Sequence, residues 1–426
     1  MALDKPGAPI GAKKKLVAPA GSKSLVRLRT LAVRTLAQVL NSTQSLDQSM
    51  FEEISRNNAQ TLPEFDRAWI FEICSGVLRF KGRIDYIIDT YALKKKPTGA
   101  LRRYLMTAVF QLLEQDVASA LVVSETVDAI RLGEGDFPSK FANAILRKVA
   151  DARDEWKAWK VNEKTPRPEV IAWSSLPEWL FKKLEKEKGL PWTLAFAESC
   201  LKRPQTWYQN LVTGESQLLE GGYRGDEPKG YVQDISNQEL VKKVVSVIRE
   251  RIKNKELPAT PRILDLCSAP GGKSLGLAVN GFKVTATDID ENRLQKVIEN
   301  KTRLDLSSLI TVVSYKDVIN ETEKFDVIWI DAPCLSTGIV RRHPEVKWNR
   351  SEKDLPGLVA KQKELVSWAK QHLSENGLLI YSTCSVLKIE NDHPHGDRFK
   401  LLSQVEWFPQ ESPYGDAIVA SILLSD

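Results

Sequence analysis

Two cysteines stand where two predicted strands end. Cys334 closes the run Asp331-Ala-Pro-Cys after the apolar residues 327–330, and Cys384 closes Tyr381-Ser-Thr-Cys after 378–380. A lone cysteine usually behaves as a small buried apolar residue. Two of them at the carboxyl ends of strands lie where open α/β sheets bind ligands, and a cysteine thiolate is a nucleophile. The pair therefore predicts chemistry at this edge of a sheet.

A glycine-rich turn follows a third apolar run, 263–267, and reads Ser268-Ala-Pro-Gly-Gly-Lys273 before a predicted helix. Such a turn lets backbone N–H groups approach a ligand closely. A phosphate-binding P-loop would need glycine where Cys267 stands, and the GxGxxG dinucleotide pattern is absent because Gly271 and Gly272 are adjacent. A nucleoside-type cofactor remains, with Asp288 at the end of the next strand placed to bind a ribose.

The elements that must position these residues change character along the chain. Apolar residues at helical spacing run from 25 to 152 and predict a helical bundle, whereas strands and helices alternate from about 230 and predict a parallel sheet covered on both faces. We expect an all-α bundle, a small α+β subdomain and an α/β Rossmann-type core. The predicted boundaries are a flexible basic leader at 1–24, the bundle at 25–152, a linker at 153–175, the small subdomain at 176–229 and the core at 230–426.

The composition excludes some classes of protein and site but does not indicate a function by itself. The 426 residues carry 61 basic and 55 acidic side chains, a net charge of +6, which permits a polyanionic partner without establishing one. The five cysteines show no CxxC pair, so neither a disulfide framework nor a zinc site is expected, and we expect no metal. No apolar run reaches the length of a membrane span, and a signal peptide is not evident, so a cytoplasmic protein is expected.

Together these motifs resemble the RNA cytosine-5 methyltransferases that use S-adenosylmethionine. The resemblance rests on Cys267-Ser-Ala-Pro-Gly-Gly-Lys273, Asp331-Ala-Pro-Cys334 and Ser382-Thr-Cys384-Ser385 with Glu390-Asn391. The run Arg341-Arg-His-Pro-Glu-Val-Lys-Trp348 is similar to the RsmB (Sun/Fmu) type of bacterial 16S ribosomal RNA methyltransferase. The N-terminal half resembles the NusB-like RNA-binding domain of that type, in runs such as Phe141-Ala-Asn-Ala-Ile-Leu-Arg147.

The resemblance implies a role for each site residue. Cys384 would be the nucleophile that adds to carbon 6 of the base, Cys334 would assist product release, and Asp331 would be the partner of cytosine N3. The sequence alone does not rank the two cysteines, because DNA-type enzymes use the Pro-Cys position. The resemblance also implies that the cofactor S-adenosylmethionine contacts Cys267, Ser268, Ala269, Pro270, Gly271, Gly272, Lys273, Asp288, Asp317 and Asp331.

The RNA contacts are expected near the Cys334 loop, because unstacked bases are held by aromatic and arginine surfaces. The candidates are Arg341, Arg342, Lys347, Trp348 and Arg203. The expected partner is ribosomal RNA, with no membrane, no protein partner and a monomeric chain. Two alternatives stay open: the same chemistry on transfer RNA or another RNA, and a non-catalytic RNA-binding or ribosome assembly factor. An amino-group methyltransferase is disfavoured, because Asp331-Ala-Pro-Cys334 stands where its (Asp/Asn)-Pro-Pro-aromatic motif belongs.

Overall fold

The structure is a computed structural model that describes residues 22–57, 59, 62–93, 95–220, 229–392, 399–411 and 415–425. The chain divides into two compact units, Met1–Trp173 and Ser174–Asp426. Nearly all of the predicted leader, 1–24, lies outside the described residues. The five predicted segments are finer than this division, and their boundaries stay predictions. In the described ranges, none of the helices is both long enough and apolar enough to cross a membrane.

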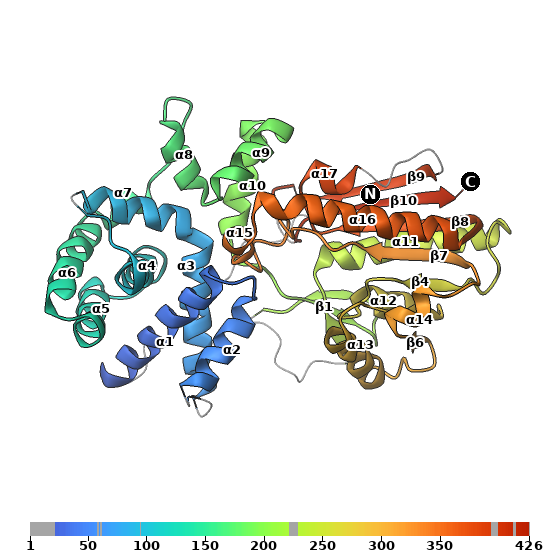
Figure 1. The fold of residues 1–426 in the computed structure, drawn as a ribbon, viewed down its shortest axis with the longest axis horizontal. Coiled ribbons are helices and arrows are strands. Elements are labelled where there is room, and N and C mark those ends of the chain that lie inside the picture. The colour runs from blue at the N-terminus through green and yellow to red at the C-terminus, as the bar shows by residue number, and fades with distance from the viewer. Residues whose placement is uncertain are drawn as a thin grey trace. The chain divides into compact units, whose positions relative to one another are not determined.

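All regular elements among the described residues of the first unit are helices, as the apolar spacing predicts (Figure 1). The stripe that begins at Leu28 and continues through Ala32 and Leu36 is fully buried. One charged side chain, Arg29, is also buried, and its guanidinium donates a hydrogen bond of 2.7 Å to Gln111. The helices are α1 (Ser22–Leu40), α2 (Leu46–Arg56), α3 (Glu64–Tyr91), α4 (Gly99–Glu114), α5 (Ser119–Glu134), α6 (Asp136–Asp151), α7 (Arg153–Lys157) and α8 (Arg167–Ser174).

The second unit opens with two helices and a small antiparallel sheet. Pro177 is the N-cap of α9 (Glu178–Lys188), and α10 (Leu190–Leu201) follows. The strands β1 (Trp207–Asn210), β2 (Ser216–Leu218) and β3 (Gly230–Val232) pair in the order β2-β1-β3. The chain then enters α11 (Ile235–Lys253), whose N-cap is Asp234.

A seven-stranded sheet forms the centre of this unit, in the order β6-β5-β4-β7-β8-β10-β9 (Figure 1). Its strands are β4 (Ile263–Asp265), β5 (Val284–Ala286), β6 (Ile310–Val312), β7 (Phe325–Asp331), β8 (Leu373–Thr383), β9 (Phe399–Trp407) and β10 (Ile418–Ser425). The helices between them are α12 (Gly272–Val279), α13 (Glu291–Arg303), α14 (Tyr315–Ile319), α15 (Val346–Asn349), the 3-10 turn η1 (Glu352–Asp354), α16 (Leu355–His372) and α17 (Lys388–Asn391).

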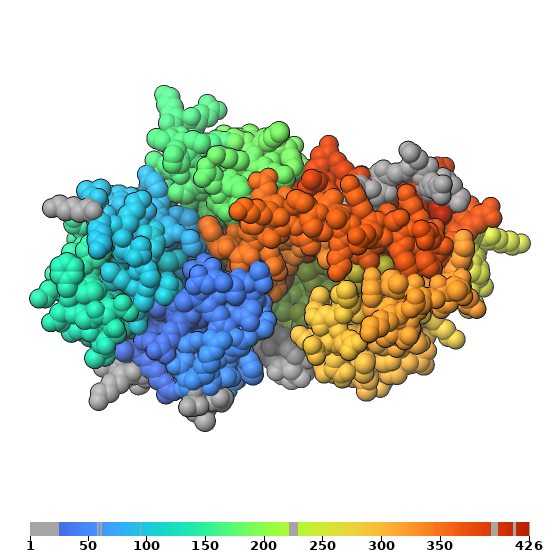
Figure 2. All heavy atoms as spheres, viewed as in Figure 1, coloured from blue at the N-terminus to red at the C-terminus, as the bar shows by residue number. Residues whose placement is uncertain are grey.

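Alternate residues of the central strands face opposite layers of helices. Val327 and Leu378 pack with α11 on one face, while Ile328 and Leu379 pack with α16 on the other. In Figure 2, α16, drawn in orange, forms the outer surface over its face of the sheet. This burial on both sides explains why the strands are nearly continuous apolar runs.

The predicted parallel sheet carries antiparallel strands at one edge. The neighbouring strands β6, β5, β4, β7 and β8 are all parallel, but β10 pairs antiparallel with both β8 and β9. Strand β10 is a largely buried apolar run, whereas β9 is not. Most residues of β9 are exposed or only partly buried, so the strand lacks the apolar run by which buried strands are recognised.

Candidate active site

The glycine-rich turn joins β4 to α12 and lies against the end of the neighbouring strand β5. Gly271 is the N-cap of α12 and has a φ of +110°, a conformation that favours glycine. The Asp288 carboxylate accepts hydrogen bonds from the backbone N–H of Ala269 (3.1 Å) and from that of Asp290 (3.0 Å). The structure therefore brings the predicted ribose acid next to the predicted cofactor turn.

Asp317, the predicted acid near an adenine, lies in the first turn of α14 and is exposed. Its carboxylate accepts a hydrogen bond of 2.6 Å from the Ser314 hydroxyl, and its own N–H donates back to that hydroxyl at 3.2 Å. Ser314 is the N-cap of α14, and the hydrogen bond that its hydroxyl accepts from Asp317 N–H stabilises the start of the helix. A structural role thus accounts for these contacts of Asp317, and its cofactor role stays a prediction.

The two predicted catalytic cysteines meet at the carboxyl ends of β7 and β8. These strands are parallel neighbours, with Asp331 opposite Ser382. The backbone pairing continues past both strands, because Ala332 N–H donates to Ser382 O and Gly338 N–H donates to Cys384 O, each at 2.8 Å. The Sγ atoms of Cys334 and Cys384 lie 3.4 Å apart, within hydrogen-bonding distance.

This contact separates the protonation of the two thiols. Either thiol can donate this hydrogen bond, and with Cys334 as the donor the contact lowers the pKa of Cys384 below its ordinary value. The same contact, together with burial, raises the pKa of Cys334. The described cysteines outside the sheet edge differ: burial raises the pKa of Cys74 and of Cys200, which is typical of inert core thiols. Cys384 is therefore the residue of the pair that favours the thiolate.

Asp331 lies between the cysteine edge and the glycine-rich turn. Lys273 Nζ donates to one carboxylate oxygen at 2.6 Å, and the Ser382 hydroxyl donates to the other at 2.9 Å. Lys273 also donates to Asn237 at 2.9 Å. The Asp331 side chain is 35% exposed, so it faces both a cation and solvent. Each carboxylate oxygen of Asp331 therefore accepts one hydrogen bond, and one of the two donors is a cation.

A cavity of about 550 Å³ opens beside these groups. The cofactor turn lines it through Ser268 to Pro270, Gly272 and Lys273, and Asp331 joins them. Within the described structure, the buried Ser268 hydroxyl has no hydrogen-bond partner. A buried polar atom facing a cavity without a partner indicates room for a polar ligand. Cys334, Cys384 and Asp288 do not line this cavity.

Two cations of the basic loop after Cys334 lie in the interior. Arg341 and Lys347 are each only 1% exposed; Arg341 pairs with Asp416 at 3.2 Å, and Lys347 donates to Ser175 O at 2.9 Å. These contacts give both side chains a structural role, and their RNA contacts stay predictions. Trp348 is partly buried and Arg203 is exposed, and their RNA contacts stay predictions.

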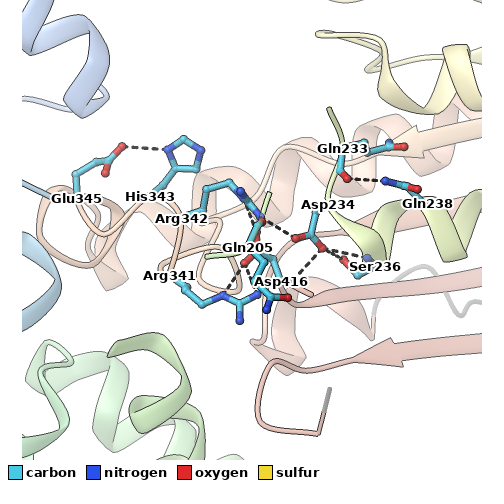
Figure 3. Close-up of polar contacts among 10 residues, drawn as sticks. All are labelled: Gln205, Gln233, Asp234, Ser236, Gln238, Arg341, Arg342, His343, Glu345 and Asp416. Atoms are coloured by element: carbon cyan, nitrogen blue, oxygen red, sulfur yellow. Dashed lines mark hydrogen bonds and ion pairs between the residues drawn. The ribbon is translucent and has the colours of Figure 1, made fainter. Parts of the chain in front are cut away.

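Arg342 joins three distant segments, as Figure 3 shows. Its guanidinium donates to Asp234 at 2.8 Å, to Asp416 at 2.8 Å and to Gln205 O at 3.1 Å. Asp416 N–H in turn donates to Asp234 at 2.9 Å. The sequence analysis did not identify these two acids as partners of the loop. They lie 182 residues apart in the chain, and no local pattern shows that they meet.

Comparison with known proteins gives the same order of parts. The model of a family described as "16S rRNA methyltransferase RsmB/F" matches residues 253–406, and the NusB family model matches 26–151. A Shigella flexneri protein called ribosomal RNA small subunit methyltransferase B is 30% identical over 401 residues, which cover 85% of this chain and 88% of that protein. A protein of the same name from Escherichia fergusonii matches equally.

Two solved structures share the fold. The crystal structure of PH0851 is similar with a TM-score of 0.68 and 20% identity, over 96% of this chain and all of that one. A methyltransferase homologue from Pyrococcus horikoshii is similar with a TM-score of 0.50 and 17% identity, over 61% of this chain and 98% of that one. These likenesses support the predicted architecture of a Rossmann-type methyltransferase core.

Proposed function

We propose that this protein methylates carbon 5 of a cytosine in small-subunit ribosomal RNA. The chain belongs to the RsmB/F family of 16S rRNA methyltransferases. The methyl donor in this proposal is S-adenosylmethionine. The observation that carries it is the pair of thiols, 3.4 Å apart, at two adjacent strand ends beside the cavity of the glycine-rich turn. A binding module has no need of such a pair.

The residues present fit the proposed cofactor. The turn Ser268–Lys273 offers an unpaired serine hydroxyl to the cavity, and Asp288 stands against the same turn at the end of β5. Cys267 to Lys273 with Asp288, Asp317 and Asp331 would hold it, as the sequence resemblance implies. When bound, S-adenosylmethionine supplies an electrophilic methyl group to the site.

Carbon 5 of cytosine is a weak nucleophile, so the protein must raise its electron density. In the proposed mechanism the Cys384 thiolate forms a bond to carbon 6, and carbon 5 then accepts the methyl group. Asp331, held by Lys273 and Ser382, serves as the polar partner of the base at N3. The target base must leave its stack to reach these groups.

Product release breaks the bond between the Cys384 sulfur and carbon 6. Carbon 5 gives its proton to a water molecule that acts as the base, the electron pair of the C–H bond forms the 5,6 double bond, and the sulfur of Cys384 leaves as a thiolate. The Cys334 thiol donates a hydrogen bond to that sulfur, so the contact that favours the thiolate before reaction also stabilises it as a leaving group. This supports Cys384 as the nucleophile and Cys334 as the residue that assists release.

Trapping on target RNA tests the assignment. Cys334→Ala should accumulate a denaturant-stable protein–RNA adduct, Cys384→Ala should form none, and the control Cys74→Ala, which removes a buried thiol of the first unit, should turn over as wild type. Full methylation by Cys384→Ala would overturn the proposal.

Methyl mapping of total RNA from a deletion strain tests the substrate: a loss confined to transfer RNA would favour that alternative, and no loss would favour a non-catalytic assembly factor.

A further inference from the structure

Two buried side chains hold the backbone on both sides of Cys334. Gln362, in α16, donates to Pro333 O at 2.8 Å, and the Glu390 carboxylate, in α17, accepts from Leu335 N–H at 3.0 Å. The Gln362 amide also donates to the same oxygen of Glu390 at 3.2 Å. Both side chains have no exposed surface. Residues 333 and 335 are thus joined through one hydrogen-bonded pair, here called the Glu390–Gln362 clamp.

The clamp is itself attached to the strand that carries the other cysteine. Tyr381, near the end of β8, donates from its hydroxyl to Glu390 O at 2.9 Å. Thr383, the last residue of β8, donates to the side chain of Asn391 at 2.6 Å. The Asn391 amide donates in turn to Ser385 O at 3.0 Å. The short helix α17 therefore moves with β8, and its carboxylate reaches across to the Cys334 loop.

A buried carboxylate at this place needs a reason beyond stability. Removing such a group from water is costly, and apolar residues of similar volume often stabilise an interior position at least as well. Burial raises the pKa of Glu390, which shows that the site disfavours its charge. The hydrogen bonds that it makes fix a loop geometry instead, because they end on the backbone next to Cys334.

We propose that Glu390 and Gln362 are positioning residues that fix the peptide on both sides of Cys334, so that its thiol presents its proton to Cys384. The inference rests on the proposed function, because it concerns how the two thiols share their roles. A second effect acts in the same direction: the nearby carboxylate of Glu390 disfavours a thiolate on Cys334 and contributes to its raised pKa.

The first experiment measures adduct formation and product release in single-turnover reactions with target RNA. Glu390→Ala removes the acceptor for Leu335 N–H and should slow product release about 10- to 100-fold, because small misplacements of a catalytic group have effects of that order. Its adduct level should approach that of Cys334→Ala. Glu390→Gln keeps a carbonyl oxygen and nearly the same volume, so it should restore release to within about 3-fold of wild type.

The second experiment asks whether Glu390 acts through Cys334. Once the thiol is absent, its position no longer matters, so adding Glu390→Ala to Cys334→Ala should change release no further. A multiplicative slowing in the double variant would overturn the proposal, because it would show that Glu390 acts elsewhere. Trp368→Phe is the matched control: it removes a hydrogen bond of the same helix as Gln362, to Ile319 O, and should release product as wild type.

The outcomes separate this inference from the proposed function. If Cys334→Ala accumulates no adduct, the proposed division of roles between the cysteines fails, and the clamp fails with it. If Cys334→Ala traps RNA while Glu390→Ala releases it at the wild-type rate, only the clamp is wrong. Should Glu390→Ala not fold, Gln362→Leu provides the same test with a side chain of similar size, and an unchanged release rate there would equally overturn the inference.

Discussion

Removal of the Arg342 guanidinium should lower the stability of the second unit. This side chain joins Asp234 and Asp416, whose side chains are only 7% and 3% exposed, through two hydrogen bonds of 2.8 Å. Arg342→Met keeps much of the side-chain volume but leaves both carboxylates short of a partner. Arg341 still pairs with Asp416, so the loss falls most heavily on Asp234.

The expected cost follows from burial. Breaking a buried ion pair by removing one partner costs about 3–5 kcal/mol. Arg342 is itself 28% exposed, so water compensates in part, and we expect the lower end, about 3 kcal/mol of unfolding free energy. Arg342→Lys should recover about half of this, because an ammonium group cannot contact both carboxylates in the planar arrangement of a guanidinium.

The loss should also grow with pH. Burial raises the pKa of Asp416 in the folded chain, and Arg342 opposes that rise. Without the guanidinium the folded pKa lies further above the unfolded one. An acid with a raised folded pKa gives full stability below its unfolded pKa and loses it as pH rises toward the folded value. Arg342→Met should therefore be more destabilised at pH 8 than at pH 5.

Hydrogen exchange on the full chain measures the stability of the second unit separately from that of the first. The exchange rates are corrected for the intrinsic effect of pH. Peptides from α11 and β10 flank the network and should lose protection in Arg342→Met. The control is Lys182→Ala, which breaks a surface pair with Glu178 in the same unit and should change stability by less than about 0.5 kcal/mol. Equal protection in Arg342→Met and wild type would refute the reasoning.

Three further predictions follow from single contacts. Gly338→Ala should lower methylation at least about tenfold, since its Cβ would lie 2.7 Å from Cys384 O, whereas the control Gly357→Ala has open space and should retain activity. Asp288→Ala should weaken S-adenosylmethionine binding about tenfold by calorimetry, a loss of about 1.4 kcal/mol, because the carboxylate against the glycine-rich turn is removed. Burial raises the pKa of Asp265 to about 7. The stability of the wild type should therefore fall relative to that of Asp265→Asn between about pH 4 and 7. Denaturant unfolding at pH 5 and pH 8 would detect this change.

Local sequence patterns were sufficient for most of the fold. Helix α13 is one of the helices expected after residue 230, and its sequence marks it clearly, because Asp290 caps it and its apolar spacing is regular. The strand predicted to continue to Cys267 ends at Asp265, where the chain leaves the sheet for the glycine-rich turn. Strand β9 was missed, since an exposed edge strand has no apolar run to mark it.

Long-range pairing limited what could be predicted about the site. The positions of Cys334, Cys384 and Asp331 follow from strand ends alone, which sequence reveals. Arginine and lysine normally indicate surface, so Arg341 was predicted to be exposed; its partner Asp416 is 75 residues away, and no local pattern shows the pair. Gln362 did leave a signal, because it occupies the apolar stripe of α16 together with Leu365 and Val366.

The pairing of β7 with β8 brings the two thiols together although 50 residues separate them along the chain. Both cysteines leave adjacent strands whose backbone hydrogen bonds continue to Gly338 and Cys384, so the strand ends place the sulfur atoms near each other, and the Glu390–Gln362 clamp holds the Cys334 loop there. A single cut at the exposed bonds of 352–354 should therefore preserve the sulfur pair, provided that α16 stays packed on the sheet. The two strands could then be supplied by two separate polypeptides and still assemble one reactive centre.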